Sequence, residues 1–305
     1  MYKYIYDRLK FASYRGKLMD KNTSKDVFLD LKMKYRLAER VSDSFTNDEK
    51  KGSFCFCPDI NHIYINYEKF LETHVGLDSY IANLLYLFDY VHELEHVKQD
   101  KFVNKTKYED ITDPLLKLEY YLDSCSFEIT ALTNKEPDEY TDKDWKIVNE
   151  LCFDINDNPK DKFKERYSNN HDLLFIERIA NIRAIQFVYN FIECNDKTIF
   201  EKKKALALFR KVYYLFLLTN TRDYCGDFMN TFGFKHRADE IYSLINEIND
   251  TYKLDDETRL MYGLNVKQDS FLEFYELFLS NTSYYVEEDK KLNFWSLRRI
   301  KSKTK

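Results

Sequence analysis

The sequence predicts an α+β protein that is predominantly α-helical. Residues that break helices are scarce, since the 305 residues include only 6 glycines and 4 prolines, and no proline follows Pro159. From residue 78 onward apolar residues recur at helical spacing, whereas two short segments near residue 60 alternate between apolar and polar side chains. We therefore expect a small β-hairpin early in the chain and helices over most of the rest.

The first expected helix begins at Thr23 or Ser24, either of which can serve as its N-cap. A charged loop at residues 46–52 comes after this helix. The apolar residues that we expect to face the core are Val27, Phe28, Leu31, Tyr35, Leu37 and Ala38.

The hairpin is expected from two alternating segments, residues 53–57 and 62–67. The four residues between them start with Pro58 and end with Asn61, which is typical of a type I turn. Cys55 and Cys57 lie two apart on one strand face. Because no further cysteine is near them, we interpret them as small buried side chains and not as a metal-binding pair.

The clearest helix covers residues 78–101, with Asp78 or Ser79 as its N-cap. Its apolar face is wide and comprises Tyr80, Ile81, Leu84, Leu85, Leu87, Phe88 and Val91. A helix with so wide an apolar face must be buried. The two histidines and two glutamates in its second half therefore need a partner, and a metal ion is one.

Later helices are indicated by their start signals. Asp113 followed by Pro114 begins a helix that runs to residue 132. Thr141 and Asp144 have the spacing of a capping box, which opens another helix.

A further helix is expected over residues 172–194, and three or four more fill residues 200–300. We divide the chain into a core of residues 1–197 and a helical region of residues 198–305 that packs on it.

The motif at residues 92–96 reads HELEH. His92 and His96 lie one turn apart and about 40° apart around the helix, so both can bind one divalent metal ion. Glu93 lies about 80° to one side of the metal direction and Glu95 about 80° to the other, while Leu94 points away. Geometry alone does not choose which glutamate acts as a base.

The HExxH pattern is the signature of zinc peptidases. With residues 91–99 and 177–184, the chain resembles zincin-like HExxH metallopeptidases of the glutamate-liganded (gluzincin) type, including uncharacterised bacterial and phage HExxH proteins. The resemblance implies a zincin-like core, bound Zn²⁺ and hydrolysis of a peptide or protein substrate. It also implies that Glu93, which directly follows the first histidine, is the general base.

The resemblance further implies that a glutamate from a later helix is the third zinc ligand. The alternative continuation HExxHxxGxxH is absent, because Gln99 and Phe102 occupy the glycine and histidine positions. Glu177 is favoured, with Glu128 as its rival. The residues that favour Glu177 are Ala180 and Ala184, whose small side chains allow close helix packing, and Asn181, which can accept a hydrogen bond from a ligand histidine.

Two further roles follow from the same resemblance. His171 is the candidate for stabilising the oxyanion, although one of the 25 tyrosines is an open alternative. The strand at residues 62–67 is the candidate edge strand that pairs with extended substrate.

Composition excludes several other classes of function. The net charge of −5 comes from 47 basic and 52 acidic residues that are well mixed, so nucleic acid is not an expected partner. The basic residues 298–305 are interpreted as a solvated end. Six scattered cysteines without a CxxC pair, the lack of an apolar signal core at the N-terminus and the lack of a long apolar run predict a cytoplasmic protein without a membrane anchor.

Two other functions stay open beside the peptidase. One is a non-catalytic regulatory or binding protein of a phage or mobile element that retains a zincin-like scaffold. The other is a helical interaction protein in which His92 and His96 are buried by chance.

Overall fold

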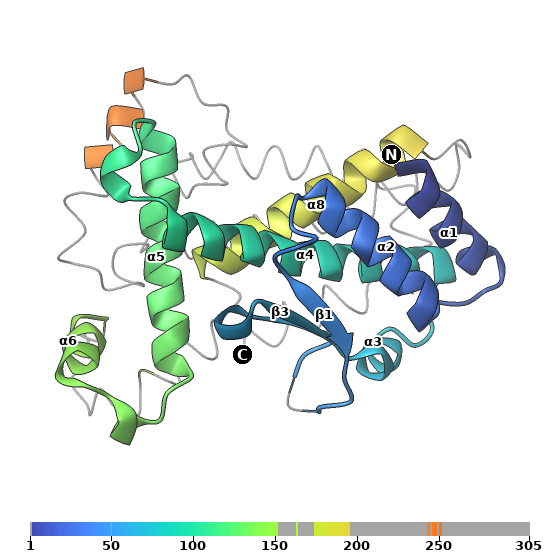
Figure 1. The fold of residues 1–305 in the computed structure, drawn as a ribbon, viewed down its shortest axis with the longest axis horizontal. Helices are drawn as coiled ribbons and strands as arrows, with labels where there is room; N and C mark the ends of the chain where they lie inside the picture. Colours follow the sequence, from blue (N-terminus) through green and yellow to red (C-terminus); the bar gives the residue numbers. More distant parts are fainter. Residues whose placement is uncertain are drawn as a thin grey trace, which may run out of the picture. The chain divides into compact units, whose positions relative to one another are not determined.

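The computed structural model describes residues 2–49, 51–151, 163, 174–195, 243–244, 246–248 and 250–251. These residues are mostly helical and include one three-stranded sheet, which confirms the predicted α+β class (Figure 1). Most of the predicted C-terminal region, residues 198–305, lies outside the described residues. The chain divides into two compact units, and the division falls after Lys98 and before Ala180.

The first unit begins with α1 (Tyr2–Tyr14), which the sequence analysis did not predict, and α2 (Lys21–Lys34). The N-cap of α2 is Asp20 and not Thr23 or Ser24, because the Asp20 carboxylate accepts hydrogen bonds from two backbone N–H groups of the first turn. The bond from Thr23 is the main cause that holds the pKa of Asp20 below its ordinary value. Leu37 lies after the helix but is buried, as expected.

The sheet of the first unit contains β1 (Ser42–Phe45), β2 (Phe54–Cys57) and β3 (His62–Ile65), in the order β1-β3-β2. The predicted hairpin is confirmed, since β2 and β3 are antiparallel and the short 3-10 turn η1 (Pro58–Ile60) joins them. β1 was not predicted and pairs parallel with the other side of β3.

The prediction that the strand at residues 62–67 is an edge strand is therefore wrong. Its ordered part, β3, is the central strand of the sheet. The cause of the error is β1, whose sequence Ser-Asp-Ser-Phe has one apolar residue and so does not show the alternation of a strand.

Helices α3 (Tyr67–Thr73) and α4 (Ser79–Lys105) complete this part of the first unit. The predicted cap Asp78 is confirmed, because its side chain accepts hydrogen bonds from the backbone N–H groups of Tyr80 and Ile81. Helix α4 is longer than expected and continues to Lys105.

An aromatic cluster packs α4 against α2 and the sheet. The Phe28 ring of α2 stacks on Tyr90 of α4 with centroids 3.7 Å apart, and Phe54 of β2 lies against both rings. Asp43 of β1 accepts a hydrogen bond from Tyr90 Oη at 2.8 Å and forms an ion pair with Lys32 of α2 at 2.5 Å. These contacts fix α4 beside the sheet (Figure 1).

The second unit contains α5 (Pro114–Thr133) and α6 (Asp142–Leu151), with the 3-10 turns η2 (Tyr108–Asp110) and η3 (Pro137–Glu139). Asp113 caps α5, as predicted. The predicted capping box is also confirmed, because Thr141 and Asp144 exchange backbone-to-side-chain hydrogen bonds of 2.9 and 3.2 Å. The bond from Thr141, followed by that from Lys135, lowers the pKa of Asp144 to about 2.

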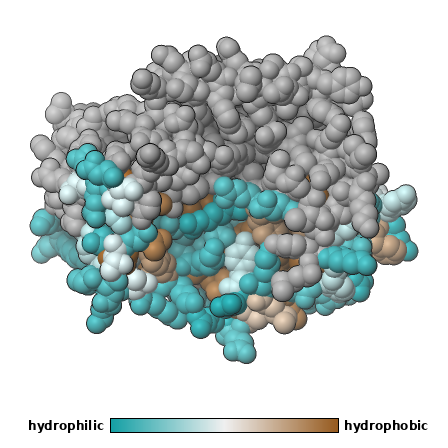
Figure 2. All heavy atoms as spheres, turned by 90° about the horizontal axis from the view of Figure 1, so that it is seen from above, coloured by the Kyte–Doolittle hydropathy of each residue, from teal (hydrophilic) through white to brown (hydrophobic). Residues whose placement is uncertain are grey.

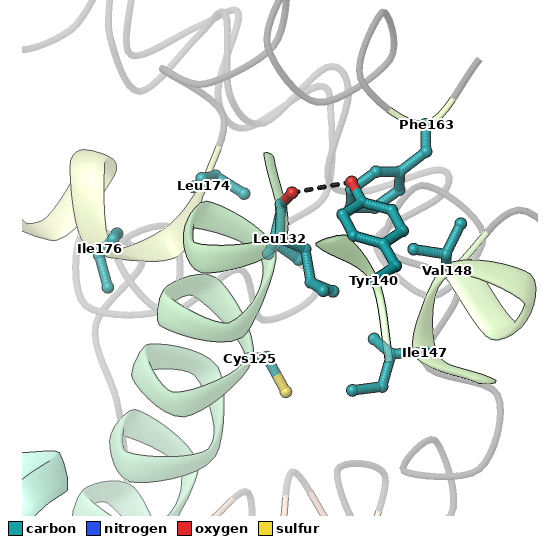
Figure 3. Close-up of a cluster of buried hydrophobic side chains, with 9 residues drawn as sticks. Cys125, Leu132, Tyr140, Ile147, Val148, Phe163, Leu174 and Ile176 are labelled. Atoms are coloured by element: carbon teal, nitrogen blue, oxygen red, sulfur yellow. Dashed lines mark hydrogen bonds between the residues drawn. The ribbon is translucent and has the colours of Figure 1, made fainter. Parts of the chain in front are cut away.

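The core of the second unit is an apolar cluster between α5, α6 and the residues that begin the next helix. Tyr140 is its polar member and satisfies its hydroxyl by donating to the Leu132 carbonyl at 2.8 Å (Figure 3). The other members are Cys125, Ile129, Leu132, Ile147, Val148, Phe163, Leu174 and Ile176.

Helix α8 (Phe175–Asn195) begins three residues later than predicted. In the first unit its rings meet those of earlier elements, Phe191 with Tyr6 at 6.0 Å and Phe187 with Tyr35 at 6.2 Å. Over the described residues, every helix is too short or too polar to cross a bilayer. Figure 2 shows mostly hydrophilic side chains on the described surface of one face, with smaller hydrophobic areas between them.

Candidate metal centre

The two motif histidines face each other on α4. The Nε2 atoms of His92 and His96 lie 2.9 Å apart, and the two rings are nearly perpendicular, at 89°. Leu94, which the helical wheel places away from the histidines, is fully buried. The helix thus presents two imidazole nitrogens at one point.

Glu177, in the first turn of α8, joins the two histidines. Each of the three residues offers a ligand atom, and these atoms lie within 4.8 Å of one another, so the group could hold a metal ion. Within the described residues it is the one such group of histidine, cysteine and acidic side chains. Glu128 lies on α5 and is not a member.

Contacts on both sides of Glu177 hold α8 beside α4. In the first unit, Arg183 Nη1 lies 3.9 Å from a carboxylate oxygen of Glu95. In the second unit, Gln99 Nε2 donates to the carbonyl oxygen of Ile176 at 3.1 Å. The small residues Ala180 and Ala184 are fully buried, in keeping with the close packing that the sequence analysis expected.

Glu93 is held by the backbone of the sheet. Its Oε2 accepts a hydrogen bond of 2.7 Å from the Phe56 N–H, and the residue is 8% exposed. Asn66 N–H donates to the Ser53 carbonyl, and bonded pairs alternate along an antiparallel ladder. The Phe56 N–H therefore faces away from β3, on the edge that β2 forms in the described sheet.

Glu95 has a different environment. It is 2% exposed and forms an ion pair with Lys98 Nζ at 2.6 Å, in addition to the longer contact with Arg183. Tyr35 also hydrogen-bonds to it, and burial together with the negative charge of Glu95 raises the pKa of Tyr35 far above its ordinary value. The Glu95 carboxylate thus interacts with two cations and one hydroxyl group.

The remaining predicted residues have separate outcomes. Asn181 lies on α8 and is 8% exposed, and its bond to a ligand histidine stays a prediction. His171 lies outside the described residues. Cys55 and Cys57 are half-buried, whereas we expected them to be buried.

Sequence reasoning missed the residues that surround the motif. The three-residue spacing of Glu95 and Lys98 on one helix was a signal for their ion pair. The hydrogen bond from Phe56 and the contact with Arg183 join segments distant in sequence, and no local pattern indicates either.

Two imidazoles and one carboxylate form a donor set that zinc binds in catalytic sites, with a further position for water. No protein-family model, curated protein or solved structure matches this chain.

Proposed function

We propose that this protein is a zinc-dependent metallopeptidase with a zincin-like core, which hydrolyses peptide bonds in a peptide or protein substrate. The observation that carries the proposal is the group of His92, His96 and Glu177, whose ligand atoms lie within 4.8 Å of one another. The hydrogen-bonded Glu93 beside it supports a catalytic site, because a purely structural zinc site has no use for a general base. The cysteine pattern favours the cytoplasm as the place of action.

In this mechanism His92, His96 and Glu177 would hold the metal. A zinc ion bound there would lower the pKa of a water ligand and polarise a substrate carbonyl. Glu93 accepts the proton of the attacking water and then transfers it to the leaving amine. The Phe56 N–H fixes one carboxylate oxygen of Glu93, so the other is the one that exchanges the proton.

The metal content of purified protein tests the ligand set. We expect one zinc ion per chain in the wild type and in Glu128→Ala, and loss of zinc in Glu177→Ala, as measured by inductively coupled plasma mass spectrometry. Glu128→Ala is the matched control, since Glu128 is a half-buried glutamate on a neighbouring helix.

Other results would contradict the proposal in distinct ways. A wild-type protein without zinc would exclude the enzyme. Loss of zinc only in Glu128→Ala would move the third ligand to α5. Stoichiometric zinc without hydrolysis of a peptide library would favour a non-catalytic zincin-like binding protein.

A further inference from the structure

The buried side chain of Gln99 connects α4 to α5 and to the first turn of α8. Its Nε2 donates to Asp123 Oδ1 of α5 at 3.2 Å and to the carbonyl oxygen of Ile176 in α8 at 3.1 Å. Gln99 is 1% exposed and Asp123 is fully buried. A side-chain amide nitrogen carries two hydrogens, so both are used here.

Both ends of the bond from Gln99 to Ile176 lie close in sequence to candidate metal ligands. Gln99 follows His96 by three residues on α4, and Ile176 directly precedes Glu177 on α8. A helix carbonyl has a second lone pair, so Ile176 can accept from a side chain in addition to its bond within the helix. The Gln99 amide therefore links the helix of the two histidines to the backbone beside the third ligand.

We propose that Gln99 is a positioning residue for Glu177, which sets the first turn of α8 at the distance from α4 that metal binding requires. The inference rests on the proposed function, because it gives Glu177 the role of a metal ligand. Asp123 orients the amide of Gln99, and the bond to Ile176 transmits that orientation to Glu177. Groups that orient metal ligands change metal affinity about ten- to a hundredfold when they are removed.

A purely structural role would need only the bond between Gln99 and Asp123, which ties α4 to α5. Three variants separate the two bonds. Gln99→Glu replaces the amide donor by an oxygen. A proton shared with the buried Asp123 carboxyl cannot also reach the Ile176 carbonyl, so the bond to Ile176 is lost. Asp123→Asn keeps an oxygen that accepts from Gln99, so both bonds remain.

The double variant Gln99→Glu/Asp123→Asn exchanges donor and acceptor at unchanged net charge. Its new amide on α5 can donate to the new carboxylate on α4, so the link between α4 and α5 is restored. Nothing in this pair donates to the Ile176 carbonyl, so the link to α8 is not restored. The double variant therefore distinguishes the two roles.

Two measurements on the full chain test the inference. Zinc affinity is measured by competition with a chromophoric chelator, and stability without metal by urea unfolding in excess chelator. Gln99→Glu should weaken zinc binding about tenfold or more and lower the unfolding midpoint. The double variant should recover the midpoint while its zinc affinity stays low. Asp123→Asn, which keeps both bonds, should weaken zinc binding less than Gln99→Glu does.

Asn83→Leu is the control for buried amides in general. Asn83 is fully buried in the first unit, and its amide donates to the carbonyls of Lys17 at 2.9 Å and Ser79 at 2.8 Å. Its loss should lower the unfolding midpoint without changing zinc affinity. Gln99→Met, which lacks the donor and adds no charge, should weaken zinc binding as Gln99→Glu does and replaces it if that variant does not fold.

Recovery of zinc affinity in the double variant would overturn the inference, since Gln99 would then act only through α5. Unchanged affinity in Gln99→Glu or Gln99→Met would overturn it as well and would leave the proposed function standing. A wild-type protein that binds no zinc would overturn both.

Discussion

Glu93 and Glu95 occupy opposite flanks of α4 at nearly equal angles from the two histidines, yet their neighbours are chemically unlike. On one flank, the backbone N–H of Phe56 at the edge of β2 donates to Glu93. On the other flank, Lys98 and Arg183 neutralise Glu95, and Tyr35 hydrogen-bonds to it.

The difference shows how a local symmetry is broken by tertiary structure. Glu95 belongs to a charged network with Lys98 and Arg183. Glu93 instead accepts a hydrogen bond through Oε2 from one neutral backbone N–H. These surroundings support the proposal that Glu93 is the base, which is the residue that the family resemblance implies.

The largest expected effect is on catalysis. Glu93→Gln should retain zinc and lower kcat/KM for a peptide substrate by about 10²- to 10⁴-fold, because the general base is lost. Glu95→Gln should retain activity within a few-fold, although its loss of charge leaves Lys98 and Arg183 without their carboxylate. Zinc content and circular dichroism of both variants control for misfolding, and an equal loss of activity in the two would remove the distinction.

A smaller effect is expected from the backbone donor of Glu93. Phe56→Pro removes the N–H, and the β-ladder should survive because this N–H faces away from β3. Phe56→Ala removes the ring but keeps the N–H and serves as the matched control. We expect kcat/KM of the proline variant to be about tenfold below that of the alanine variant, as for the loss of one bond to a charged group. Equal activities would show that the bond does not position the base.

The smallest effect concerns the other flank and depends on pH. Tyr35→Phe deletes the hydroxyl bonded to Glu95, and we expect it to lower the free energy of unfolding by about 1 kcal/mol near neutral pH. The pKa of Tyr35 is raised by folding from an ordinary value of 10.0, so its stabilisation is present below pH 10 and is lost as the pH rises further. Urea unfolding should therefore show a difference between wild type and variant that shrinks above pH 10. A difference that grows at alkaline pH would contradict this environment for Tyr35.

Much of the fold could be predicted because its signals are local. Asp78 and Asp113 cap their helices, Thr141 and Asp144 form their capping box, and Pro58 begins the turn of the hairpin. The strand β1 gave no local signal. Its place in the sheet depends on Asp43, which binds a lysine of α2 and a tyrosine of α4 that are distant in sequence.

The candidate site likewise has one part that the sequence predicts and another part that it does not. The two histidines follow from helical spacing, and Glu177 followed from the resemblance together with the small residues behind it. The donor from Phe56, the ion pair with Arg183 and the bonds of Gln99 all require the packed structure. Sequence thus indicated which residues could bind a metal, whereas the contacts around them were found only in three dimensions.

The parallel pairing of β1 with β3 has a consequence for the order of folding. The β2–β3 hairpin joins strands that are adjacent in the sequence, so it can close within microseconds. β1 pairs with β3, although β2 lies between them in the sequence, and Asp43 of β1 is bonded by Tyr90, which is distant in sequence. We expect β1 to join the sheet late, after α2 and α4 have met. The hairpin edge that holds Glu93 would then exist before the sheet acquires its third strand.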